Sequence, residues 1–285
     1  MKKLIATLFA ASLCAQGFLG AVGFEVNTSY DYFRGIPDGS WNGNSGALVS
    51  GNMGFDLTEC IGLQLGGSWG LYNWDGRENQ VFKNPKALEQ QAFITAGAYA
   101  FQGDFSFGLN YDRMYVKHFS IYDVSASFDQ LRFQGGYRFC AEEVGVWGTA
   151  KLSTAHKHAL GLPVKFKAIN QINVFWSHYF DNYAAATVWV GAPYGNSLRY
   201  HHKAAGEFDM GFSLRAPLTD CLYVDAHAAY MRARNASGSK QSRNYDSNVC
   251  VGLTYLFGDI CSQYGATYLP VANNSNFFVD SNINH

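Results

Sequence analysis

The feature that most constrains this chain is a two-residue alternation of apolar and polar side chains, which recurs along nearly its whole length. Phe105, Phe107 and Leu109 alternate with Ser106 and Asn110. The same pattern recurs near residues 26–32, 47–57, 131–139, 208–215, 222–228 and 248–257. Successive side chains of a strand point to opposite faces, whereas the face of a helix repeats about every 3.6 residues. The alternation therefore predicts an all-β protein whose strands each have one apolar and one polar face.

Connections between the predicted strands alternate strictly between short and long. The pattern gives about twelve strands, near residues 24–33, 45–57, 61–74, 89–101, 105–116, 128–140, 144–154, 166–180, 184–193, 206–217, 221–234 and 245–257. Short breaks fall near residues 58–60, 102–104, 141–143, 181–183 and 218–220, with longer polar stretches between them. An even strand count with short periplasmic turns and longer outer loops is typical of single-chain barrels of the bacterial outer membrane.

Composition separates such a barrel from a secreted or periplasmic β-sandwich. Aromatic residues make up 16% of the chain and it has 30 glycines, whereas charged residues make up only 15%. An ordinary soluble domain carries roughly a quarter charged residues. Low charge with abundant Tyr, Phe and Gly favours an antiparallel transmembrane β-barrel whose outer face meets the lipid bilayer, with the β-sandwich as the alternative. The net charge of -1 argues against a nucleic-acid partner.

The first residues have the layout of a secretory signal. Met1-Lys2-Lys3 is basic, residues 4–13 are almost wholly apolar, and Ala21-Val22-Gly23 has small residues where cleavage requires them. A lipoprotein signal using Cys14 is disfavoured because Leu13 replaces the small residue expected before the cysteine. We therefore expect a signal peptide over 1–23, export to the bacterial outer membrane, a transmembrane barrel over 24–257, and a polar periplasmic tail over 258–285 that is disordered or folds back under the barrel.

Several short phrases along the chain carry a family resemblance. They are Gly43-Asn44-Ser45-Gly46-Ala47, Gly70-Leu71-Tyr72-Asn73-Trp74-Asp75-Gly76-Arg77, Ser127-Phe128-Asp129-Gln130-Leu131-Arg132, Ala192-Pro193-Tyr194-Gly195, Arg215-Ala216-Pro217-Leu218-Thr219 and Gln241-Ser242-Arg243-Asn244-Tyr245. With them the chain resembles an uncharacterised, porin-like family of exported bacterial outer-membrane β-barrel proteins. The final strand, alternating from Val251 to Phe257, also resembles the terminal strand that barrel-assembly machinery recognises. The resemblance implies the architecture and no known activity.

Charged residues recur on the polar faces that would point into the lumen. They are Asp31, Asp56, Asp112, Arg132, Arg138, Lys151, Glu207, Asp209, Arg215, Asp225 and Asp246. In a hollow barrel these charges line a polar pathway and bias which ions enter. In a filled barrel they form an internal network of paired charges. A narrow channel is the favoured interpretation over a plugged barrel.

Five of the six cysteines follow the signal, and in an oxidising compartment they are candidates for disulfides. Cys60, Cys140, Cys221 and Cys261 map to the predicted periplasmic rim, and Cys250 lies within a strand. Adjacent final strands bring Cys221 near the exit of the last strand. A Cys221–Cys261 bridge that ties the tail to the barrel is therefore predicted, with free thiols or bonds to other molecules as the alternative.

Motifs for catalysis or cofactor binding are weak. Ser177 and His178 are adjacent and point to opposite faces of a strand, and His156-x-His158 and His201-His202 lack a nearby carboxylate or cysteine. No cofactor, metal site or catalytic residue is predicted.

The favoured function is a porin-like channel for small hydrophilic solutes. The alternatives are a closed structural or surface-interaction barrel acting through its loops or tail, and an outer-membrane lipid hydrolase. The oligomeric state stays open.

Overall fold

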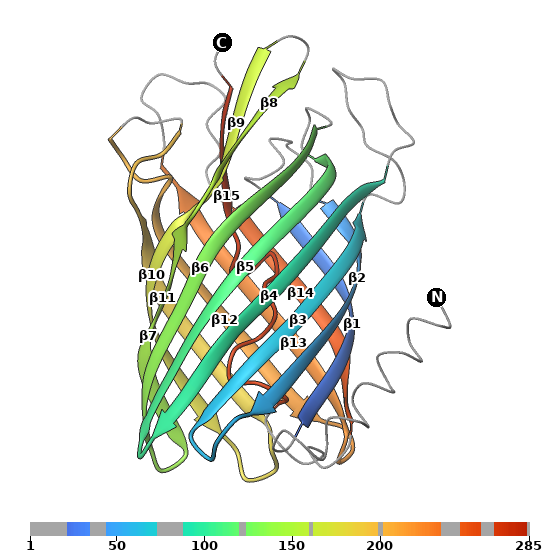
Figure 1. Ribbon diagram of the computed structural model, residues 1–285, viewed down its shortest axis with the longest axis vertical. Helices are drawn as coiled ribbons and strands as arrows, with labels where there is room; N and C mark the ends of the chain where they lie inside the picture. Colours follow the sequence, from blue (N-terminus) through green and yellow to red (C-terminus); the bar gives the residue numbers. More distant parts are fainter. Residues whose placement is uncertain are drawn as a thin grey trace.

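The computed structural model describes residues 22–34, 44–72, 88–119, 124–159, 162–198, 202–234, 246–257 and 265–283. Twelve strands close into one antiparallel barrel (Figure 1). They are β1 (Val22–Arg34), β2 (Asn44–Asp56), β3 (Ile61–Tyr72), β4 (Glu89–Gln102), β5 (Phe105–Phe119), β6 (Val124–Phe139), β7 (Glu142–Lys151), β10 (Asn170–Tyr179), β11 (Ala185–Tyr194), β12 (Gly206–Pro217), β13 (Leu222–Ala233) and β14 (Asp246–Phe257). Each pairs with its neighbour in chain order, β7 pairs with β10, and β14 pairs with β1 to close the ring. The predicted fold and strand count are confirmed.

Connections differ between the two ends of the barrel. At one end, strands are joined by the short turns 57–60, 103–104, 140–141, 180–184 and 218–221. We call this the short-turn end and the opposite one the long-loop end. β1 begins and β14 finishes at the short-turn end, because Phe24 pairs with Phe257 of β14 and also with Met53 of β2, close to the turn 57–60.

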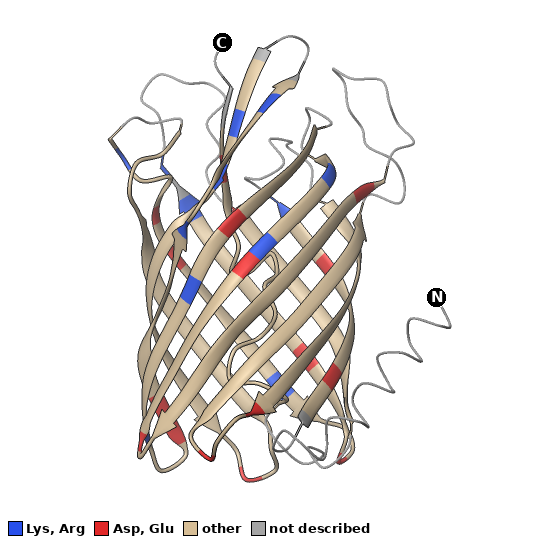
Figure 2. Ribbon diagram, in the orientation of Figure 1, with Lys and Arg blue, Asp and Glu red and all other residues tan. Residues whose placement is uncertain are grey.

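Alternation along each strand divides the wall into an apolar outer face and a polar lumen face. On β5, Phe105, Phe107 and Leu109 are about half exposed, whereas Ser106 and Asn110, at the alternate positions, are fully buried. Figure 2 shows that few segments of the wall carry a charge. No helix in the described part of the chain is long and apolar enough to cross a bilayer.

Three further strands lie outside the ring. The connection from β7 to β10 forms a hairpin of β8 (Thr154–Ala159) and β9 (Leu162–Ala168), and β15 (Val279–Ile283) pairs with β9. The sequence predicted a loop near residues 155–165, because each strand is too short to establish a pattern. The third strand comes from the far end of the chain, and that pairing has no local sequence signal.

The C-terminal segment runs through the barrel, where Figure 1 shows it as the red trace inside the wall. Thr267 bonds β2, Tyr268 bonds β7, and β15 then pairs with β9 at the long-loop end. The predicted periplasmic tail is therefore corrected for residues 265–283, which lie in the lumen and at its long-loop mouth. An Asn-rich composition suggested a solvated tail, yet its apolar residues, among them Leu269, Val271 and Phe277, are buried.

Candidate functional site

The candidate site is the lumen with the segment that fills it, residues 265–279, which we call the plug. At the short-turn end the plug is held by carboxylates of the wall. The backbone N–H of Ala266 donates to Glu25 Oε2 at 3.3 Å, and the hydroxyl of Tyr268 donates to Glu143 Oε1 at 2.7 Å. Ser106 Oγ donates to the same Glu143 oxygen at 2.6 Å. Charge-assisted hydrogen bonds of this kind are the stronger ones, so both carboxylates fix this end of the plug.

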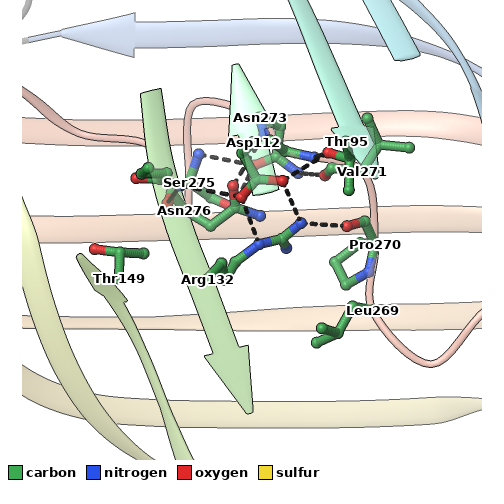
Figure 3. A network of polar contacts seen from close by, with 12 residues as sticks. Thr95, Asp112, Arg132, Thr149, Leu269, Pro270, Val271, Asn273, Ser275 and Asn276 are labelled. Carbon is green, nitrogen blue, oxygen red and sulfur yellow. Dashed lines mark hydrogen bonds and ion pairs between the residues drawn. The ribbon is translucent and has the colours of Figure 1, made fainter. Parts of the chain in front are cut away.

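A buried ion pair holds the middle of the plug (Figure 3). Arg132 Nε lies 2.9 Å from Asp112 Oδ2, with side-chain exposures of 3% and 0%. Arg132 Nη2 also donates to the carbonyl of Pro270 at 2.7 Å. Thr95 donates to Asp112 at 2.7 Å and accepts from the backbone N–H of Ala272 at 2.9 Å. Burying two charges is costly unless further hydrogen bonds satisfy them. Part of that satisfaction comes from the plug, so wall and plug complete one network.

Asp31 holds the plug nearer its far end. Its Oδ2 accepts from the hydroxyl of Tyr72 at 2.8 Å and from Asn274 Nδ2 at 2.7 Å, and its Oδ1 accepts from Asn248 Nδ2 at 2.6 Å. Asp31 and Asn274 are both buried. One plug amide is therefore bonded to a carboxylate that two other wall residues orient.

An apolar cluster closes the long-loop mouth on the side of β4, β5 and β6, and we call it the aromatic seal. Its buried members are Phe93, Met114, Val116, Phe119, Val124, Ala126, Phe128, Val164, Phe166, Ala168, Ala272, Phe277 and Val279. Phe277 of the plug packs edge-on against Phe93, with ring centroids 5.9 Å apart. Phe119, Phe128 and Phe166 pack together at 5.8–6.1 Å. Wall, hairpin and plug thus share one apolar core.

Beyond the seal, Asp280 ties β15 to the loop after β11. Its carboxylate accepts from Ser197 Oγ at 3.0 Å and from the backbone N–H of Leu198 at 2.6 Å. Burial raises the pKa of Asp280 above its usual value, against the opposing effect of these donors and of nearby Lys167. Burial likewise lowers the pKa of Lys167, whose ammonium donates to the carbonyl of Asn196.

Small residues in the wall make room for the plug. A methyl group at Gly54 would collide with the backbone carbonyl of Ala266, and one at Gly108 would lie 2.6 Å from Leu269 Cδ1. Gly54 is on β2 and Gly108 on β5, both on the lumen face. Glycine allows a close backbone approach that any side chain would prevent.

The plug leaves a cavity of about 330 Å³ on one side of the lumen. Its wall comes mainly from β10 to β14, β1 and β2, and residues 267–273 of the plug form part of its lining. Arg215 lies in this wall and bridges Glu25 at 3.1 Å and Asp225 at 2.7 Å. The cavity therefore has a mixed polar and apolar lining, and the cation Arg215 is already bonded to two carboxylates.

The charges predicted to line the lumen fall into three groups. Asp31, Asp112, Arg132, Arg215 and Asp225 belong to the networks above. Asp56 accepts from Tyr99 at 3.0 Å, Arg138 pairs with Glu143 at 3.0 Å, and Asp209 and Asp246 are buried in the wall. The remaining two, Lys151 and Glu207, are exposed.

Glu207 differs from the prediction for a local reason. The register of β12 against β13 shifts between Gly206 and Phe208, so Glu207 has no partner position on β13. It forms an exposed ion pair with Arg232 at 3.1 Å instead. A bulge changes which face a side chain points to, and the sequence alternation alone does not reveal it.

Other residues singled out from the sequence are dispersed. Ser177 is buried and lies within hydrogen-bond distance of Thr187, while His178 pairs with Glu142 at 2.7 Å, in keeping with their opposite faces. His156 and His158 lie on β8, and His201 is outside the described residues. Cys60 and Cys140 are exposed free thiols in short turns and Cys250 is a buried one. Cys261 is also outside the described residues, so its pairing with Cys221 stays a prediction.

Sequence reasoning missed Glu25, Glu143 and the plug itself. The sequence places Glu143 in a short turn, yet in the structure it is fully buried. Apolar residues near the C-terminus, Phe277 to Val279 above all, were the available signal for the plug, because a solvated tail has no need of them.

The chain matches the model of a family of unknown function (DUF6666) over residues 10–279. The chain belongs to this family. Among solved structures, it is similar to the COG4313 outer membrane channel from Pseudomonas putida F1, with a TM-score of 0.56 and 10% identity, covering 84% of this chain and 96% of that one. A chain solved in a study of in-meso crystallization of membrane proteins has a TM-score of 0.50 and 14% identity, covering 92% and 99%. These likenesses show the fold of outer-membrane β-barrels. No curated protein matches.

Proposed function

We propose that this protein is a closed outer-membrane barrel whose own C-terminal segment is a resident plug, and that it acts at the cell surface through its long-loop mouth. The observation that carries the proposal is the hydrogen bond from Arg132 to the carbonyl of Pro270. Arg132 belongs to β6, and its guanidinium also forms the buried ion pair with Asp112. This interpretation replaces the porin-like channel favoured by the sequence.

Placement in the outer membrane is supported by the outer face of the wall. Large apolar residues from every strand of the ring except β13 are exposed there, among them Leu65, Leu109, Val174, Met210 and Val251. A soluble protein rarely exposes so continuous an apolar surface, whereas a lipid bilayer covers it favourably. The signal peptide predicted over 1–23 fits export to this membrane. In this orientation the short-turn end faces the periplasm.

Closure is supported by the kind of contact the plug makes. If the plug were a mobile gate, its movement would expose its own polar groups and those of the wall. Each of these groups would then have to form hydrogen bonds with water. Here its release would leave the buried pair Asp112–Arg132 without the Pro270 carbonyl and would open the aromatic seal. A hydrogen bond to a charged group such as Arg132 contributes about 1.5–3 kcal/mol relative to its replacement by water, and release would also expose the apolar side chains of the seal to water. The plug is therefore part of the folded core.

A specific observation favours a second candidate, a channel for small solutes. The cavity of about 330 Å³ beside the plug is lined by polar residues such as Ser50, Thr187 and Thr254. If this space were continuous with both ends, ions could pass beside the plug. Catalysis has a weaker basis, because Ser177 and His178 lie on opposite faces.

Planar-bilayer recording tests the proposal against the channel. We expect the wild-type protein to be silent and a variant that lacks residues 265–285 to show discrete openings, provided that both migrate as folded barrels in unheated gels. Steady openings of the wild type equal to those of the truncated variant would contradict closure. Release of fatty acid from phospholipid by the purified protein would instead favour the hydrolase.

A tether between plug and wall belongs to the same proposal. Cys221 lies in the short turn before β13, and Cys261 lies in the sequence between β14 and the plug. A bridge between them would hold the base of the plug at the short-turn end. Peptide mapping without reduction is expected to recover the two cysteines in one cross-linked species, and their recovery as separate thiols would refute the tether.

A further inference from the structure

Three possible metal ligands form one row across adjacent strands of the wall. The register pairs Asp31 of β1 with Cys250 of β14, and pairs Cys250 with His227 of β13. Directly paired residues of a sheet point to the same face, with β-carbons about 4.5–5.5 Å apart. Cys250 and His227 both line the lumen cavity. The row therefore faces the space that the plug leaves open.

The ligand atoms of the row are already close together. The carboxylate oxygen of Asp31, a ring nitrogen of His227 and the sulfur of Cys250 all lie within 4.8 Å of one another. Zinc binds nitrogen and oxygen at about 2.0–2.2 Å and sulfur at about 2.3 Å, so tetrahedral ligands are roughly 3.3–3.8 Å apart. Small side-chain rotations would bring the three atoms to that spacing.

Two of the three groups lack a strong partner of their own. His227 Nε2 is buried and has no hydrogen-bond partner among the residues that the structure describes. Cys250 is a buried free thiol. A buried imidazole nitrogen without a partner is unfavourable, and coordination of a cation would satisfy it.

The third group, Asp31, is oriented by its neighbours. Asn248, Tyr72 and Asn274 donate to its two oxygens at 2.6–2.8 Å. Donors of this kind fix the direction of a ligating carboxylate. The nearby carboxylate of Asp225 is not counted as a ligand, since Arg215 and Thr254 already bond it.

We propose that Asp31, His227 and Cys250 bind one divalent transition-metal ion of the zinc class, with a fourth position open to the cavity. One thiolate, one imidazole and one carboxylate suit this borderline-soft ion, whereas calcium and magnesium prefer oxygen ligands alone. Binding displaces the thiol proton of Cys250 to solvent, so the affinity falls at acidic pH. The ion would also link wall and plug, because Asn274 of the plug bonds its ligand Asp31. The site does not depend on whether the lumen conducts.

Cobalt(II) is the probe for this site in the full-length folded protein in detergent. We expect one Co²⁺ per chain, with a thiolate-to-cobalt absorption band that Zn²⁺ abolishes by competition. Cys250→Ser should lose the band, and His227→Gln should weaken binding by at least about tenfold. Cys140→Ser and His178→Gln are matched controls away from the row and should bind like wild type. Equal binding by the folded Cys250→Ser variant, or no binding by wild type, overturns the proposal.

A second measurement needs no change at the site and decides the matter if the variants fail to fold. In a chain with Cys60→Ser and Cys140→Ser, Zn²⁺ should slow alkylation of Cys250 at least about tenfold, as mapped by mass spectrometry. An alkylation rate that is the same with and without Zn²⁺ would contradict the site.

Discussion

The two halves of the barrel wall contact the plug in different ways. Strands β1 to β7 bond it along its length, through Glu25, Asn52, Thr95, Arg132 and Glu143. Strands β10 to β14 contact it through apolar residues at its two ends and line the cavity between them.

Those apolar contacts are local. Ala266 packs with Tyr223 and Leu256 near one end of the plug, and Phe278 packs with Ala229 and Met231 near the other. The first half of the wall is therefore the main support of the plug. The space for a small ligand lies against the second half together with β1 and β2. His227, whose Nε2 has no hydrogen-bond partner in the described part of the chain, and the thiol of Cys250 both belong to this second half.

The largest expected effect comes from removing the ion pair that grips the plug. Arg132→Met leaves Asp112 buried without its cation, and breaking such a pair costs about 3–5 kcal/mol. The free energy of unfolding from urea titration checks this. The matched control is Arg113→Met, because Arg113 forms a more exposed pair with Asp129 at 3.6 Å, and such a pair contributes at most about 1 kcal/mol. Equal losses of unfolding free energy in both variants would mean that Arg132 does not hold the plug.

An intermediate effect is expected from filling the space that the plug occupies. Gly54→Ala places a methyl group against the carbonyl of Ala266, and overpacking of this kind costs about 1–3 kcal/mol. The plug should shift, and brief channel openings should appear in bilayer recordings. Gly51→Ala is the control, since a methyl group there meets only ordinary contacts, the nearest at 3.6 Å. Identical behaviour of the two variants would argue against a plug at this position.

The smallest effect concerns the pH dependence at the long-loop mouth. Because the pKa of Asp280 is raised in the folded protein, its ionisation disfavours folding. Its contribution is most favourable below the unfolded pKa of about 3.9 and is lost as pH rises through the higher folded pKa. Asp280→Asn should therefore flatten the fall in stability over that window, as measured by thermal unfolding across pH. An unchanged pH profile would show that Asp280 is not buried in this contact.

The sequence predicts the wall well because the relevant signal is local. Each strand can be identified from the alternation of its own residues, as in Phe105 to Leu109. The short turns follow from the few residues that separate one alternating segment from the next. The plug has no such repeat, since Thr267, Pro270 and Asn274 each bond a different strand far away in sequence. Its contacts exist only after the ring has closed.

The candidate metal row could be predicted from the sequence even less than the plug. Cys250 could be assigned to a strand from the sequence, and Asp31 to a polar face. Their alignment with His227 depends on the register of three strands, and a shift of one residue would move a ligand to the outer face. No spacing between residues 31, 227 and 250 could have revealed it.

The most direct test of the account is the position of the C-terminus in intact cells. An epitope tag after His285, in a chain expressed in a bacterium with an outer membrane, should be labelled by antibody without permeabilisation. The plug carries the chain from the short-turn end, which we propose faces the periplasm, to the long-loop mouth. A tag in the short turn 218–221 is the control and should need permeabilisation. Labelling of the C-terminal tag only after permeabilisation would contradict a plug that traverses the barrel.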